Sequence, residues 1–135
     1  MSAIMADPAD RSSLSYRFRQ KRDEGLRAFM LAARQSNGAP CRVVDLGGGV
    51  AYWERVGLDW LGAHGFEVTC INNAADELTR DAREKGPIAI AVGDACNLAA
   101  FGDNHFDIVH SNSVIEHVGG WSRIADFARE VRRLA

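Results

Sequence analysis

The sequence predicts an α/β fold in which helices cover both faces of a parallel sheet. Short apolar runs alternate with segments of helical period along most of the chain, which is typical of parallel strands joined through helices. A glycine-rich turn, "GGG" at 47–49, follows the first of these runs. The chain has 135 residues, of which 47% are hydrophobic, so it is long enough for one domain with its own core.

The expected elements follow one another along the chain. The first helix should run from Ser13 to Gln35, because the "SNGAP" at 36–40 favours left-handed backbone and then places a proline that cannot continue a helix. Strands are expected at 42–46, 66–71, 88–92 and 106–111, and further helices at 51–64, 76–85 and from 121 onward. The last helix carries an apolar stripe that starts at Trp121 and includes Phe127 and Leu134.

Composition excludes several classes of protein. The net charge is only -2, which gives the chain no strong attraction to nucleic acid or to anionic membranes. Three scattered cysteines, Cys41, Cys70 and Cys96, do not fit a disulfide framework or a structural zinc site, and we expect Cys70 and Cys96 to be core residues. No metal site is expected. No apolar run has the roughly 20 residues that a membrane span requires, and the N-terminus carries no secretion signal. We therefore expect a soluble, cytoplasmic protein.

The stretch "VVDLGGGVAYW" at 43–53 contains the main candidate for a ligand site. Glycines between a strand and a helix let a ligand approach the backbone, although the same glycines also suit a tight turn without a ligand. Asp45 lies in the strand, where an unpaired charge is costly, so it needs amide donors from the loop or a cationic group of a ligand. A phosphate would be repelled, and the dinucleotide pattern G-x-G-x-x-G breaks at Tyr52, which disfavours a nicotinamide-dependent dehydrogenase.

The same stretch resembles the first motif of class I S-adenosylmethionine-dependent methyltransferases, hydrophobic-hydrophobic-D-x-G-x-G-x-G. Three further stretches resemble later parts of that family in the right order: "VTCINNAADEL" at 68–78, "VGDACNLAAFGDNHFDIVHSNSVIEHV" at 92–118, and "FAREVRRLA" at 127–135. The resemblance covers residues 40 to 135. It implies a Rossmann-like sheet, S-adenosylmethionine as the cofactor, and methyl transfer as the reaction.

The resemblance also implies a role for each matching position. Asp45 and the loop of Gly47, Gly48 and Gly49 would face the methionyl part of the cofactor. Asn72, with Asn73 beside it, would meet the ribose hydroxyls. Asp94 would accept a hydrogen bond from the adenine amino group, with Ala95 and Cys96 near the ring. Ser111 and Asn112 would line the methionyl end.

Two positions depart from the family pattern, and a third position has an explanation that needs no ligand. The family usually has an acidic residue where this chain has Asn72, and an asparagine has only one acceptor oxygen for the two ribose hydroxyls. Ala51 stands at the third glycine position. Asp94 in "GDACNL" would also suit a turn or a helix cap without any ligand.

The acceptor of the methyl group is less well defined. A general base is needed mainly for weakly acidic acceptors, and His117 is the best candidate, ahead of Glu116 and His110. His117 could instead pack or cap the last helix, and we expect His110 to be structural. The segment "SNSV" at 111–114 differs from the N-P-P-Y type of amino-methyltransferases, which favours a small-molecule acceptor. The alternative is a non-catalytic remnant that binds S-adenosylmethionine or a protein partner.

The expected organisation is a basic helical extension at 1–39, which is either a solvated charged face or a lid, followed by the cofactor-binding core at 40–135. The family fold continues with further strands, whereas this chain stops after its fourth strand and the following helix. We therefore expect it to be part of a longer protein. One alternative is a homodimer that covers the open edge of the fourth strand, because such an edge otherwise invites aggregation. The other is a reduced cofactor-binding module without turnover.

Overall fold

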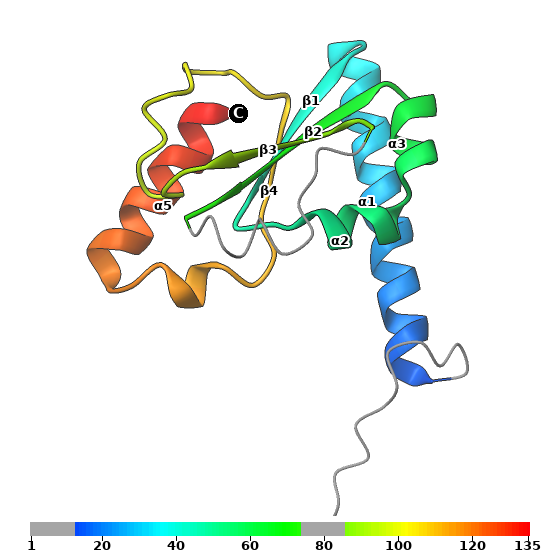
Figure 1. Ribbon diagram of the computed structural model, residues 1–135, viewed down its shortest axis with the longest axis horizontal. Coiled ribbons are helices and arrows are strands. Elements are labelled where there is room, and N and C mark those ends of the chain that lie inside the picture. The colour runs from blue at the N-terminus through cyan, green and yellow to red at the C-terminus, as the bar shows by residue number, and fades with distance from the viewer. Residues whose placement is uncertain (1–12, 74–85) are drawn as a thin grey trace, which may run out of the picture.

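The computed structural model of the protein describes residues 13–73 and 86–135. One sheet of parallel strands has the order β3-β2-β1-β4 (Figure 1). The strands are β1 (Cys41–Leu46), β2 (Phe66–Asn72), β3 (Ile88–Val92) and β4 (Ile108–His110). The predicted α/β fold is confirmed, and the helix predicted at 76–85 lies outside the described residues.

The described helices form a layer on each side of this sheet, as Figure 1 shows: α1, α2 and α3 lie on one side and α5 on the other. α1 begins after Ser13, whose hydroxyl caps the helix by accepting from the Tyr16 amide at 3.2 Å. The bounds are α1 Leu14–Asn37, α2 Val50–Val56, α3 Leu58–Ala63, the 3₁₀ helix η1 Ile115–His117 and α5 Trp121–Leu134. No helix in these described segments has the length and apolarity to cross a bilayer.

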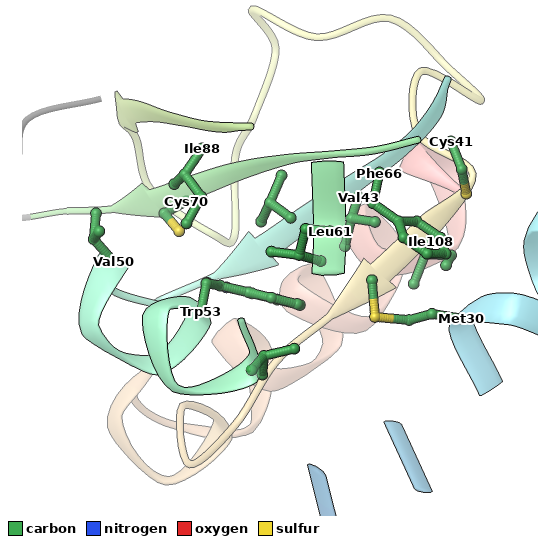
Figure 2. Packing of buried hydrophobic residues seen from close by; sticks show 12 residues of the cluster. Met30, Cys41, Val43, Val50, Trp53, Leu61, Phe66, Cys70, Ile88 and Ile108 are labelled. Carbon is green, nitrogen blue, oxygen red and sulfur yellow. The ribbon is translucent and has the colours of Figure 1, made fainter. Parts of the chain in front are cut away.

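Strand β1 has apolar residues on both faces, because helices cover both faces of the sheet. Val43 points into the cluster under α1 to α3, and Val44 and Leu46 point into the cluster under α5. Figure 2 shows side chains of the first cluster, with Met30 from α1 and Trp53 from α2 gathered beside the strands. The core therefore consists of two clusters separated by the sheet.

The prediction of a single helix at 51–64 is wrong, because the helix is interrupted at Gly57. This residue has φ +115°, a conformation that side chains rarely adopt, and it separates α2 from α3. The Arg27 guanidinium donates to the Val56 carbonyl at this break. Arg27 also lies over the Trp60 ring, 5.1 Å from its centre, so α1 holds the break in place.

The fourth strand is shorter than predicted: β4 covers three residues instead of the expected 106–111. Phe106 donates its amide to the Leu134 carbonyl at 3.0 Å, so it is tied to the end of α5 rather than to the sheet. Asp107 accepts from the Arg42 amide at 2.7 Å through its side chain. The predicted strand was too long because it included residues on either side of the three that are in register with β1.

The last helix forms as predicted, but its apolar stripe starts later. Phe127 and Leu134 are buried against the sheet. Trp121 is 87% exposed, although the periodicity placed it on the same stripe. As the first residue of α5, it precedes the part of the helix that packs on the strands.

All three cysteines are free thiols and buried. Cys41 and Cys70 belong to the cluster under α1 to α3, and Cys96 belongs to the cluster under α5. Burial raises the pKa of Cys70 to about 12. The prediction that Cys70 and Cys96 are core residues is confirmed.

A buried carboxylate joins three elements beneath the glycine loop. Asp45 in β1 is only 1% exposed, and its two oxygens accept from the Trp53 indole Nε1 and the His110 Nδ1, each at 2.8 Å. The sequence suggested loop amides or a ligand cation as its partners, whereas the side-chain donors that the structure shows come from α2 and β4. Two aromatic donors from α2 and β4 satisfy the charge instead, which explains how it is tolerated in the core.

A second polar network fastens α5 to the loop after β3. Glu130 accepts from the Leu98 amide at 2.7 Å and from two nitrogens of Arg133 at 2.8 Å. Arg133 also donates to the carbonyls of Leu98 and Phe101. Hydrogen bonds from Arg133 and from the Leu98 amide lower the pKa of Glu130 despite its burial.

We predict that Trp53→Phe lowers the free energy of unfolding by about 2–4 kcal/mol, because it removes a buried donor to Asp45 and leaves a void. Urea denaturation followed by circular dichroism measures the loss. The control is Trp121→Phe, which changes an 87% exposed ring and should alter stability by less than about 0.5 kcal/mol. Equal losses in the two variants would contradict the role given to the indole.

We predict that Glu130 stabilises the folded protein at neutral pH and that this contribution is lost in acid. Its pKa in the folded protein lies below the ordinary value of 4.5, so its contribution is fully present above that pH and disappears as the pH falls through the lower, folded value. Glu130→Gln should therefore be less stable at neutral pH and show a shallower loss of stability between about pH 5 and pH 3. The control is Asp126→Asn, whose partner Arg129 is 70% exposed. Parallel pH profiles for wild type and Glu130→Gln would refute this prediction.

Candidate functional site

A cavity of about 620 Å³ opens at the carboxyl ends of the strands. This size suits a small-molecule ligand, and ligands of open parallel sheets bind at this edge. Its walls come from the end of β2, from the segments that follow the four described strands and from the start of α5. They are Gly47, Ile71, Asn72, Asn73, Gly93, Asp94, Ala95, Ser113, Val114, His117, Val118 and Arg123.

The protein itself excludes side chains from two of the three loop glycines. Gly47 has φ +75°, and a Cβ there would lie 2.4 Å from a methyl group of Val114. A Cβ on Gly48 would lie 1.7 Å from the Asp45 carboxylate. A Cβ on Gly49 would meet no atom of the described chain within 4 Å. Of the three glycines, Gly47 lines the cavity, and Gly48 and Gly49 do not.

The end of β2 provides the asparagines predicted for the ribose. Asn72 is the last residue of β2, and Asn73 follows it. The Asn72 carbonyl accepts from the Gly93 amide at 2.9 Å, which holds the end of β2 beside the loop after β3. Both asparagines line the cavity, so the structure brings the predicted ribose residues together with Gly47 and Asp94.

Asp94 lies in the turn after β3, with its side chain 45% exposed. Its Oδ1 accepts from the Cys96 amide at 2.9 Å, and both of its oxygens accept from Arg123 Nη2 at 2.8 Å. The hydrogen bond from the Cys96 amide, followed by that from Arg123, lowers the pKa of this carboxyl below its ordinary value. The amide contact is the turn-capping role that the sequence also allowed. Ala95 lines the cavity, whereas Cys96 is buried behind it.

The segment after β4 reaches the cavity later than the sequence predicted. Ser111 and Asn112 are exposed and are not part of the wall. Ser113 has φ +57° and turns the chain, so that Ser113 and Val114 line the cavity in their place. His117 lines the cavity as expected and ends η1, whose backbone closes through the His117 amide and the Val114 carbonyl at 2.8 Å.

Two residues have positions that sequence reasoning did not foresee. Asp45 does not line the cavity, because the network with Trp53 and His110 holds it beneath the loop. Arg123 does line the cavity and pairs with Asp94. The two residues of this pair lie 29 positions apart, and an arginine in an amphipathic helix carries no signal that it will reach a turn after another strand.

The chain matches a family model described as a methyltransferase domain over residues 44–135, more than half of its length. No curated protein sequence matches it. The matched region contains the whole wall of the cavity.

Several solved structures share the fold. An S-adenosylmethionine-dependent methyltransferase from Archaeoglobus fulgidus is 20% identical with a TM-score of 0.61, over 86% of this chain and 48% of the other. A TehB-like S-adenosylmethionine-dependent methyltransferase from Corynebacterium glutamicum is 15% identical with a TM-score of 0.54, over 85% and 64%.

A third similar structure is a complex from Haloferax volcanii between a methyltransferase activator and a protein assigned as a methyltransferase. It is 20% identical with a TM-score of 0.54, over 84% of this chain and 51% of the other. The chain thus spans about half the length of the first solved structures that it matches. By the family match the chain belongs to this family of methyltransferase domains, and it shares the fold of the S-adenosylmethionine-dependent methyltransferases named above.

Proposed function

We propose that the cavity binds S-adenosylmethionine and that the chain is the cofactor-binding part of a methyltransferase for a small molecule. One observation supports this most strongly. Gly47 and Asp94 lie just after β1 and β3, Asn72 ends β2, and all three line one cavity of about 620 Å³. Backbone at a glycine turn, an amide side chain and a carboxylate are the kinds of group that a nucleoside joined to an amino acid requires.

Each group has a proposed contact. Asp94 accepts from the adenine amino group, and Ala95 lies beside the ring. Asn72 and Asn73 bind the ribose, while the backbone at Gly47 borders the methionyl part. Ser113 and Val114 line the cavity beyond β4, which makes them better placed for the methionyl end than Ser111 and Asn112. Contacts of Asp45, Gly48, Gly49 and Cys96 with the cofactor stay predictions.

When bound, the cofactor would supply an activated methyl group on a sulfonium, which an acceptor would take with loss of the thioether. The chain's own contribution is to hold the ligand and to keep water from the reacting atoms. His117 is the proposed base for an acceptor that must lose a proton, because it lines the same cavity. The lid role of the first 39 residues, the homodimer and the cytoplasmic location stay predictions.

We predict that the purified chain binds S-adenosylhomocysteine and that Asp94→Ala weakens this binding about tenfold or more, because a charged acceptor is lost. Asn72→Asp should tighten it, since a carboxylate accepts from both ribose hydroxyls. Isothermal titration calorimetry measures both effects. The matched control is Asp126→Ala, which removes a carboxylate paired with an exposed arginine of α5. A folded wild-type chain that does not bind the ligand would refute the proposal.

We predict that His117→Gln slows methyl transfer to hydroxyl acceptors by about 10²–10⁴-fold while leaving cofactor affinity unchanged. The measurement is transfer of a radiolabelled methyl group to a panel of small alcohols, phenols and amines across pH. The control is His105→Gln, an exposed histidine that does not line the cavity. If His117→Gln keeps the wild-type rate and pH profile, His117 is not the base. Binding without transfer to any acceptor would favour the non-catalytic alternative.

A further inference from the structure

Arg123 connects two walls of the cavity. It stands in the first turn of α5, and its Nη2 donates to both oxygens of Asp94 at 2.8 Å. Its Nε donates to the Val118 carbonyl at 3.3 Å. Asp94 belongs to the turn after β3, and Val118 belongs to the segment after β4. One side chain therefore lies across the end of the cavity at which Asp94 is exposed.

The contacts of Asp94 leave little room for another donor. Oδ1 already accepts from the Cys96 amide and from Arg123, and Oδ2 accepts from Arg123. A carboxylate oxygen has about two lone-pair sites, so Oδ1 is saturated and Oδ2 has one site left. An amino group that approaches Asp94 must use that single site or displace the guanidinium.

The pair is weak enough to open. Arg123 and Asp94 have 43% and 45% of their side chains exposed, and ion pairs of this exposure contribute little to stability. Helix α5 does not depend on it, because Phe127 and Leu134 bury its apolar face and Arg133 with Glu130 fastens it to the loop after β3. Arg123 can leave Asp94 without releasing the helix.

We propose that Arg123 is a gate at the nucleobase end of the cavity, which holds Asp94 in the ligand-free protein and yields to the adenine amino group on binding. This inference rests on the proposed function, since it takes Asp94 as the acceptor for adenine. The gate sets how strongly the site selects a purine with an amino group at its sixth position over one with a carbonyl group there. The amino group competes with Arg123 for Asp94, whereas a carbonyl group can accept from Arg123.

The test compares S-adenosylhomocysteine with S-inosylhomocysteine, which differ in this amino or carbonyl group and the adjoining ring nitrogen. Arg123→Gln should bind S-adenosylhomocysteine about two- to fivefold more tightly than wild type, the range expected for an exposed ion pair. It should bind S-inosylhomocysteine no more tightly than wild type does. The ratio of the two affinities, measured by calorimetry, should therefore rise by about the same factor.

Three further variants make the result specific. Arg129→Gln removes an arginine from the same helix that is paired with Asp126 and does not line the cavity, so its ratio should equal that of wild type. In an Asp94→Asn background, Arg123→Gln should no longer change the ratio, because the gate acts through the carboxylate. Arg123→Lys keeps the charge without the guanidinium and should shift the ratio less, and it replaces Arg123→Gln if that variant does not fold.

The outcomes separate this inference from the proposed function. If wild type and Arg129→Gln are folded and bind neither ligand, the cofactor site itself is wrong. If wild type binds S-adenosylhomocysteine and Arg123→Gln binds it equally or less tightly, the gate is refuted, and Arg123 instead positions Asp94 for the ligand. A changed ratio that persists in the Asp94→Asn background would also overturn the gate.

Discussion

The buried carboxylate of Asp45 is the constraint on which the cavity depends. A charge that is 1% exposed has to be fully paired, and its two partners come from α2 and β4. The pairing thus ties β1 to the helix that follows it and to the neighbouring strand. It also fixes the glycine loop, because the carboxylate occupies the space that a side chain at Gly48 would need. The loop thus packs against Asp45, and Gly47 in this loop lines the cavity.

The strand order decides where the cavity can form. The chain runs outward from β1 through β2 to β3 and then returns to place β4 on the other side of β1. The loops after β1 and β4 therefore diverge toward opposite faces of the sheet, and a crevice remains between them. Gly47 and Val114 both line the cavity, and glycine is required at 47 because a Cβ there would lie 2.4 Å from a methyl group of Val114. Asp94 and Arg123 also line the cavity.

Much of this arrangement could be predicted from the sequence, and the failures have physical causes. Asn72 and Asp94 could be expected at one edge of the sheet, because each follows an apolar run and parallel strands bring their carboxyl ends to one edge, and both line the cavity there. The break at Gly57 was missed because helical periodicity continues on both sides of it, and only the contact with Arg27 shows why the backbone turns there. The partners of Asp45 and of Asp94 were missed because a tryptophan, a histidine and an arginine carry no sequence signal for the carboxylate that they will reach.

The three buried thiols give the two faces of the sheet separate internal reporters. Cys41 and Cys70 lie in the cluster under α1 to α3, and Cys96 lies under α5. Burial raises the pKa of each thiol, which disfavours the reactive thiolate in the folded protein. Alkylation must therefore wait until the covering helices open. The order in which the three cysteines react would rank the local opening of one helical layer against the other, without any added label.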